Sequence, residues 1–287
     1  MSAFRPIRKL TVASIRARKG GEPIICLTAY TAMMAEILDP LVDVLLVGDS
    51  VGTVLNGHDT TIPVTVDEMI YHGRSVRRAN IKALLVIDVP FGSYEASPEQ
   101  AYLTTSRILK ETGADAVKLE GGVTQAPTIE FLVKRGVPVM AHIGLRPQAV
   151  RATGGYRIVG KTDEECKSLK EDADAVSKAG AFSVVLEGVI ESLAAEITEQ
   201  ITIPTIGIGA SPACDGQILV TEDLLGMFDR TPKFVRKFAN MRADISDAVS
   251  DYANAVRSGA FPSEAEIYSD EKTAIPFEVK TIHQQEN

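Results

Sequence analysis

Residues 83–89, with the sequence Ala-Leu-Leu-Val-Ile-Asp-Val, form a short and nearly continuous apolar run. Apolar residues at almost every position are typical of a parallel strand that is buried on both faces. Similar runs recur along the chain, and segments with helical patterns separate them. They cover residues 23–28, 44–48, 83–89, 116–120, 137–142, 182–187 and 205–209, with a less regular eighth run at 217–220.

Helix start and stop signals lie between these runs. Thr65 and Glu68 have the spacing of a capping box, and Ser97 precedes Pro98 at a first helical position. Gly113 stands just before the fourth run, where glycine commonly ends a helix. Seven or eight strand–helix units predict an α/β protein with a closed (β/α)₈ TIM barrel, whereas a doubly wound sheet would carry a Gly-x-Gly-x-x-Gly turn after its first strand.

The size and composition fit one such barrel. The chain has 287 residues, and 30 basic against 38 acidic residues give a net charge of −8. An acidic total argues against nucleic acid as the main partner. The three cysteines lack Cys-x-x-Cys spacing, which disfavours a cysteine zinc site. We expect a single domain over residues 1–262, including an N-terminal helix and extra C-terminal helices, followed by a polar tail at 263–287.

Both ends of this domain carry distinctive patterns. The first 21 residues are basic without an acid, which favours a basic amphipathic helix over a mitochondrial presequence. Apolar residues at helical spacing over 234–256 predict a face that packs on the barrel, with a subunit interface as the second option. Since no apolar run approaches the ~18 residues of a membrane span, we expect a cytoplasmic protein without membrane partners.

The residues that end the apolar runs are the candidates for chemistry, because a parallel barrel builds its active site at the carboxyl ends of its strands. A single acid there is usually a turn or a helix cap, but four carboxylates and a histidine on one face predict a functional site. These residues are Asp49, Asp88, Glu120, His142 and Glu187.

The acids divide into two groups by their expected roles. Asp49, Asp88 and Glu120 supply hard oxygen ligands that suit Mg²⁺, with water and substrate oxygens completing the shell. Lys118 points to the same side of its strand as Glu120, either as a structural ion pair or as a point charge for an anionic substrate. Glu187 has the place of a base beside a metal-bound carbonyl compound.

Two features of the same face are less specific. His142 fits a core residue as well as a residue that orients a ligand. The polar segment 146–161 is long enough to form a lid over the site.

Short blocks of sequence surround these residues in a fixed order. They include Leu46-Val-Gly-Asp-Ser50, Gly57-His-Asp-Thr-Thr-Ile-Pro-Val64, Asp88-Val-Pro-Phe91, Val117-Lys-Leu-Glu-Gly-Gly122, Ala141-His-Ile-Gly-Leu145, Gly154-Gly-Tyr156, Val185-Leu-Glu187 and Ile206-Gly-Ile-Gly-Ala210. Together these blocks resemble the ketopantoate hydroxymethyltransferase family, from about residue 11 to residue 262.

The resemblance implies a barrel of the phosphoenolpyruvate/pyruvate type, assembled as a homodecamer. It implies transfer of a hydroxymethyl group from 5,10-methylenetetrahydrofolate to the 2-oxo acid 3-methyl-2-oxobutanoate, which gives 2-dehydropantoate for pantothenate biosynthesis. By motif match, one Mg²⁺ per subunit binds Asp49, Asp88 and Glu120. The keto acid binds Asp49, Ser50, Asp88 and Lys118, and Glu187 is the proton acceptor. The match assigns no folate-binding residue.

Two alternatives stay open from the sequence. A Mg²⁺-dependent carbon–carbon lyase of 2-oxo acids would use the same acids on the same barrel. A catalytically inactive barrel that serves as a binding subunit would need no base, although the intact acids argue against it.

Overall fold

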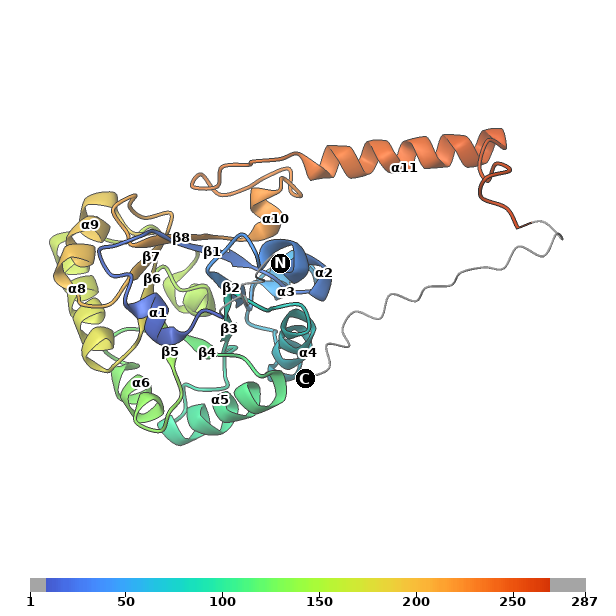
Figure 1. Ribbon diagram of the computed structural model, residues 1–287. Helices are drawn as coiled ribbons and strands as arrows, with labels where there is room; N and C mark the ends of the chain where they lie inside the picture. Colours follow the sequence, from blue (N-terminus) through green and yellow to red (C-terminus); the bar gives the residue numbers. More distant parts are fainter. Residues whose placement is uncertain (1–8, 269–287) are drawn as a thin grey trace, which may run out of the picture. The chain divides into compact units, whose positions relative to one another are not determined.

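The computed structural model describes residues 9–268, and residues 1–8 and 269–287 lie outside the described part. Eight parallel strands form a closed barrel in the order of the sequence, with helices around it (Figure 1). The strands are β1 (Ile24–Thr28), β2 (Val44–Val47), β3 (Leu84–Asp88), β4 (Ala116–Glu120), β5 (Val139–Gly144), β6 (Ser183–Glu187), β7 (Thr205–Ile208) and β8 (Gly216–Leu219).

Every predicted apolar run overlaps one of these strands, although β5 extends two residues beyond its run and β8 begins one residue before its run, so the barrel predicted from the sequence is confirmed. The less regular eighth run is a true strand, because β8 pairs with both β7 and β1 and thereby closes the ring. β8 begins at Gly216, where a Cβ would lie 2.4 Å from the Ile24 carbonyl oxygen of β1. Glycine therefore permits the close approach of β8 and β1 at the closure.

The helices lie in the connections between the strands and around them. They are α1 (Val12–Arg16), α2 (Ala32–Leu38), α3 (Val51–Val54), α4 (Val66–Arg77), α5 (Pro98–Thr112), α6 (Ala126–Val133), α7 (Val150–Thr153), α8 (Asp163–Lys178), α9 (Glu191–Gln200), α10 (Thr221–Leu224) and α11 (Met241–Ser258), with a 3₁₀ turn, η1 (Pro147–Ala149).

The expected helix signals act at the ends of the long helices. Thr65 and Glu68 form a reciprocal capping box at the start of α4. Ser97 caps α5 by accepting a hydrogen bond from the Gln100 N–H, and Gly113 ends the same helix in the left-handed conformation. These caps satisfy backbone groups that would otherwise lack partners at the helix ends.

The basic N-terminal segment packs against the amino ends of the strands. Ile15 of α1 is fully buried in the inner core with β1 residues such as Ile24 and Cys26. Three carboxylates at this end each pair with a basic residue of the segment and accept a strand N–H. The ion pairs are Lys9–Asp115, Arg18–Asp43 and Lys19–Asp215, each at 2.9 Å, and the N–H donors are Leu85, Ile25 and Thr205.

Residues 240–268 form a separate unit, which we describe by itself. Its helix α11 spans Met241–Ser258, and none of the helix residues is buried. The domain boundary at residue 262 and the packing of the 234–256 face remain predictions, and most of the expected tail at 263–287 lies outside the described residues. Among residues 9–268, no helix combines the length and the apolar character that a membrane crossing requires.

We predict that Asp215→Asn lowers the free energy of unfolding by roughly 2–3 kcal/mol at pH 7, because its carboxylate binds Lys19 and the N–H groups of Gly20 and Thr205. Although burial opposes the charge, these contacts lower the pKa of Asp215. The contribution is therefore complete above the unfolded pKa of about 4 and is lost as the pH falls through the folded value.

Urea unfolding of both proteins at pH 7 and near pH 3 measures this difference. The control is Asp174→Asn, which removes an ion pair to Lys178 on the surface of α8 and should cost about 0–1 kcal/mol. A difference between Asp215→Asn and the unchanged protein that stays constant down to pH 3 would contradict the role of the charge.

Candidate active site

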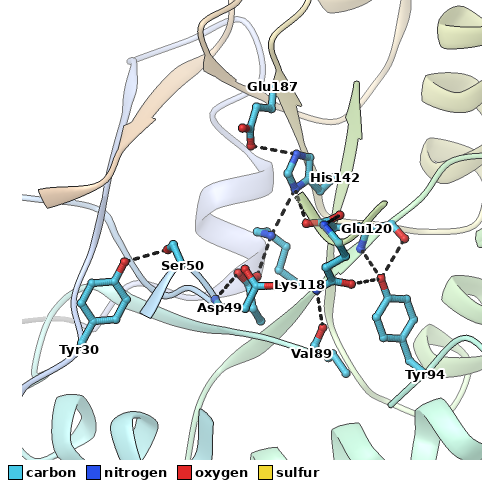
Figure 2. Close-up of polar contacts among 11 residues, drawn as sticks. Tyr30, Asp49, Ser50, Val89, Tyr94, Lys118, Glu120, His142 and Glu187 are labelled. Carbon is cyan, nitrogen blue, oxygen red and sulfur yellow. Dashed lines mark hydrogen bonds and ion pairs between the residues drawn. The ribbon is translucent and has the colours of Figure 1, made fainter. Parts of the chain in front are cut away.

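The seven residues predicted from the sequence all line one cavity of about 190 Å³ at the carboxyl ends of the strands. They are Asp49, Ser50, Asp88, Lys118, Glu120, His142 and Glu187. Figure 2 shows Lys118 and Glu120 of β4, His142 of β5, Glu187 of β6 and Asp49, which follows β2, with their side chains converging on one place. The structure thus brings together every candidate side chain that the sequence singled out.

Strand register explains how neighbouring residues meet. Asp88 on β3 is the register partner of Lys118 on β4, and Glu120 on β4 is the partner of His142 on β5. Side chains two residues apart on a strand share a face, so Lys118 and Glu120 both reach the cavity. The cavity wall is therefore set by barrel geometry more than by loop conformation.

A buried ion pair lies at the centre of the site. The Lys118 Nζ lies 2.7 Å from Asp88 Oδ1, and the Asp49 N–H donates to Asp88 Oδ2 at 3.0 Å. Lys118 is only 6% exposed. Burial opposes its charge, but the carboxylates of Asp88, Glu120 and Asp49 outweigh burial and raise the pKa of the ammonium. Lys118 is therefore charged at neutral pH.

Negative charge exceeds positive charge around this pair. Among the described residues that line the cavity, Lys118 is the one lysine or arginine, whereas Asp49, Asp88 and Glu120 are all buried. Burial and the neighbouring Asp88 raise the pKa of Asp49 to about 7. Burial and the neighbouring Asp49 also raise the pKa of Glu120 well above its ordinary value. A further positive charge would stabilise both ionised carboxylates.

The donor set fits a hard divalent cation that keeps part of its shell open. The three carboxylates carry more negative charge than Lys118 compensates. Such a set suits Mg²⁺, which usually binds one or two carboxylates and retains water or substrate oxygens. In residues 9–268, no three His, Cys, Asp or Glu side chains are grouped closely enough to hold a metal by themselves. As they stand in this structure, Asp49, Asp88 and Glu120 do not form a three-ligand group, so a cation between them would also need oxygens from water or substrate.

Glu187 differs from the three buried acids in position and exposure. Its strand, β6, is four strands away from β2 in the closed ring of eight, so Glu187 and Asp49 enter the cavity from opposite sides. The Glu187 side chain is 17% exposed. Gly144 lies beside it on β5, where a Cβ would be 2.4 Å from the Glu187 carbonyl oxygen. Glycine at this position allows the two strand ends to approach.

His142 links the buried acids to Glu187 and is itself buried. Its Nδ1 lies 3.3 Å from the Lys118 Nζ, and its Nε2 lies 3.3 Å from Glu187 Oε2. Burial and the charge of Lys118 lower the pKa of His142, so the ring is neutral at pH 7. Because an ammonium can only donate, Nδ1 accepts, and this assigns the hydrogen to Nε2, where it faces Glu187.

The remaining wall of the cavity is largely apolar. It includes Leu46, Val185, Ile208, Ile218 and Phe234. A cavity with buried charges on one side and branched aliphatic side chains on the other suits a small acid that carries a short aliphatic group.

Sequence reasoning missed three residues that support this site. Tyr30 contacts Ser50, with 2.8 Å between the two hydroxyl oxygens. Tyr94 and Gln148 are buried and form hydrogen bonds with each other and with Glu120. Neutral side chains in loops give no charge or spacing signal, so only their contacts in the fold identify them.

Comparison with known proteins places the chain in a family. Residues 9–264 match the model described as ketopantoate hydroxymethyltransferase. A relative from Sphingopyxis alaskensis, named 3-methyl-2-oxobutanoate hydroxymethyltransferase, is 57% identical over 265 residues, which cover 92% of this chain and 92% of that protein.

Solved structures with much lower identity share the fold. The structure of 2,3-dimethylmalate lyase, a member of the PEP mutase/isocitrate lyase superfamily, has a TM-score of 0.57 at 16% identity and covers 93% of each chain. Phosphonopyruvate hydrolase in complex with oxalate and Mg²⁺ has a TM-score of 0.56 at 12% identity, covering 91% of this chain and 93% of that chain. These proteins therefore share the barrel fold of this chain.

We predict that Lys118→Met lowers the free energy of unfolding by about 3–5 kcal/mol in metal-free buffer, because it leaves buried carboxylates without their cation. Asp88→Asn should also destabilise the protein, since it weakens the contact with Lys118. The double variant should lose less stability than the sum of the two single variants, by roughly 0.5–3 kcal/mol. Urea unfolding with a chelator present measures this cycle, and strictly additive losses would show that the two side chains do not interact.

Proposed function

The chain belongs to the ketopantoate hydroxymethyltransferase family, and we propose that the cavity at the mouth of its barrel binds the keto acid and performs the proton transfer. The protein is an enzyme that transfers a hydroxymethyl group to 3-methyl-2-oxobutanoate in pantothenate biosynthesis. The roles of the individual residues, the cation and the one-carbon donor are our proposals. The observation that carries them is a partly exposed carboxylate, Glu187, facing three buried carboxylates across one small cavity.

The keto acid is held by both sides of the cavity. We assign its charged end to Lys118 and Ser50, near Asp49 and Asp88, and its isopropyl group to the apolar wall around Val185 and Ile208. The cavity of about 190 Å³ is large enough for a substrate of this size. Lys118 serves as a fixed point charge, because Asp88 holds its ammonium at 2.7 Å.

Asp49, Asp88 and Glu120 are the proposed ligands of one Mg²⁺ per subunit. When bound, the cation polarises the carboxylate and 2-oxo groups of the substrate and makes the C3 proton more acidic. Support comes from the excess negative charge of the three acids and from phosphonopyruvate hydrolase, a protein with the same fold that binds oxalate together with Mg²⁺.

Glu187 is the proposed base that removes the C3 proton. Its carboxylate enters from the side of the barrel opposite Asp49, so it can reach the substrate without joining the buried acids. The His142 Nε2 lies 3.3 Å from Glu187 Oε2, and we assign to this neighbour a role in orienting the carboxylate. After the proton moves to Glu187, C3 of the resulting enolate forms the new carbon–carbon bond to the methylene carbon of the donor. Both C–N bonds of that carbon break, water supplies the hydroxyl oxygen, and tetrahydrofolate leaves with its two nitrogens protonated, one proton coming from water and the other being the one that Glu187 removed.

Other parts of the proposal follow from family membership. The one-carbon donor is 5,10-methylenetetrahydrofolate, the assembly is a homodecamer and the location is the cytoplasm. Sedimentation of the purified protein at the mass of a single subunit would contradict the decamer. The forward assay with the keto acid and methylenetetrahydrofolate tests the whole reaction, since neither a lyase nor an inactive barrel would form 2-dehydropantoate.

We predict that the purified protein with Mg²⁺ exchanges the C3 proton of 3-methyl-2-oxobutanoate in D₂O without folate. Glu187→Gln should slow this exchange by about 10²–10⁴-fold, because the amide cannot accept the proton. Proton NMR measures the exchange, and calorimetry should show that the variant still binds the keto acid in the presence of Mg²⁺. Exchange by Glu187→Gln at the original rate would rule out Glu187 as the base.

We predict that Asp88→Ala weakens Mg²⁺ binding for two reasons. It removes a proposed ligand, and it removes the carboxylate that compensates the Lys118 ammonium, which then repels the incoming cation. Calorimetric titration of Mg²⁺ into the metal-free protein measures the affinity independently of activity. Glu165→Ala is a control, since this carboxylate lies at the start of α8 and binds the N–H groups of Gly160 and Lys161. Unchanged Mg²⁺ affinity in Asp88→Ala would remove this residue from the ligand set.

A further inference from the structure

Gln148 is a buried residue that no part of the reaction described above uses. It lies in η1, in the connection between β5 and α8, and is only 6% exposed. Its side chain and backbone contact the ends of three consecutive strands, at Asp49 after β2, Val89 after β3 and Glu120 on β4. One residue therefore connects two proposed metal ligands that are 71 positions apart in the chain.

Every polar group of the Gln148 side chain has a partner. The Nε2 donates to Asp49 Oδ2 at 2.8 Å and to the Val89 carbonyl at 3.0 Å, and the Oε1 accepts from the Tyr94 hydroxyl at 2.7 Å. Because Asp49 and Val89 offer only acceptors, the NH₂ group must face them. The amide orientation is thus fixed by its surroundings.

The backbone of Gln148 completes the connection. Its N–H donates to Glu120 Oε2 at 3.1 Å, so the same residue binds one oxygen of Asp49 and one oxygen of Glu120. Tyr94 strengthens this arrangement, because its hydroxyl also contacts the backbone of Glu120 at 3.2 and 3.3 Å (Figure 2). Gln148 thus binds only one oxygen of each carboxylate, Oδ2 of Asp49 and Oε2 of Glu120, and makes no hydrogen bond to the other.

Gln148 acts from behind the carboxylates. It does not line the cavity that holds Lys118 and Glu187, but lines a neighbouring cavity of about 320 Å³ together with Tyr94 and Arg146, and Glu120 borders both cavities. Gln148 therefore does not border the cavity proposed for the keto acid, and it is connected to that cavity through its hydrogen bonds with Asp49 and Glu120.

The Gln148 side chain is uncharged, and this affects the electrostatics of Asp49 and Glu120. Asp49 and Glu120 repel each other, and each raises the free energy of ionising its neighbour in a buried site. A lysine or arginine in place of Gln148 would neutralise the carboxylates and compete with a divalent cation. A glutamate would add to the repulsion. An amide donates hydrogen bonds to the ionised oxygens and leaves the charge deficit intact.

We propose that Gln148, held by Tyr94, is a positioning residue that fixes Asp49 and Glu120 in the orientation that binds the divalent cation. The inference rests on the proposed function, since it assumes that these two carboxylates are ligands. Residues that hydrogen-bond to metal ligands typically contribute a factor of about 10–100 to metal affinity.

The test compares Gln148→Met with the unchanged protein. Methionine keeps most of the side-chain length and removes the amide hydrogen bonds. We expect Mg²⁺ affinity in calorimetry without substrate to fall by roughly 10–100-fold. The proton exchange rate at low Mg²⁺ should fall in parallel and should recover substantially at saturating Mg²⁺. Gln217→Met is the matched control on β8, where the amide donates one hydrogen bond to the Ser211 carbonyl, and it should bind Mg²⁺ normally.

Tyr94→Phe provides a second variant in case Gln148→Met does not fold. It removes the hydroxyl that binds Gln148 Oε1 and leaves Gln148 and both carboxylates in place, so a smaller loss of Mg²⁺ affinity is expected. If Gln148→Met folds and binds Mg²⁺ with unchanged affinity, the positioning role is wrong. If Gln148→Met does not fold, unchanged Mg²⁺ affinity in Tyr94→Phe decides against the role in the same way. Absence of Mg²⁺ binding and proton exchange in the unchanged protein would instead overturn the proposed function.

Discussion

The closure of eight parallel strands into one ring is the constraint on which the rest of the molecule depends. Since every strand runs in the same direction, all carboxyl ends meet at one mouth and all amino ends meet at the other. In-register pairing of β3 with β4 and of β4 with β5 then fixes Asp88 beside Lys118 and Glu120 beside His142. The site needs no special loop to collect these charges, because the barrel itself collects them.

The pKa values of carboxylates shift in opposite directions at the two ends of the barrel. At the amino end, Asp215 pairs with Lys19 and accepts strand N–H groups, and these contacts lower its pKa although burial opposes them. At the carboxyl end, burial and neighbouring acids raise the pKa of Asp49 to about 7. The same residue type therefore stabilises the fold where its charge is compensated, and leaves uncompensated negative charge at the mouth where we propose that a cation and an acid substrate bind.

The sequence predicted the barrel and the charged part of the site for a physical reason. Buried parallel strands must be apolar, so an acid such as Asp88 or Glu187 at the end of an apolar run is visible without a structure. Gln148 was not visible, because a neutral amide in a polar segment gains its meaning only from Asp49, which is 99 residues away. The segment 146–161 is long enough to form a lid, but its length does not reveal that Gln148 lies among the ends of three strands.

If Asp49, Asp88 and Glu120 hold a divalent cation, as we propose, positive side chains beyond Lys118 would compete with that cation for the same carboxylates. Under this proposal, a further lysine or arginine among Asp49, Asp88 and Glu120 would cancel part of the excess negative charge that attracts the cation. Neutral donors avoid this conflict: the Asp49 N–H binds Asp88, the Gln148 N–H binds Glu120, and the Gln148 amide binds Asp49. Each bond orients one oxygen and leaves the charge on the carboxylate. The resulting arrangement holds repelling acids together through hydrogen bonds and the single ammonium of Lys118, to which we have also assigned the charged end of the substrate.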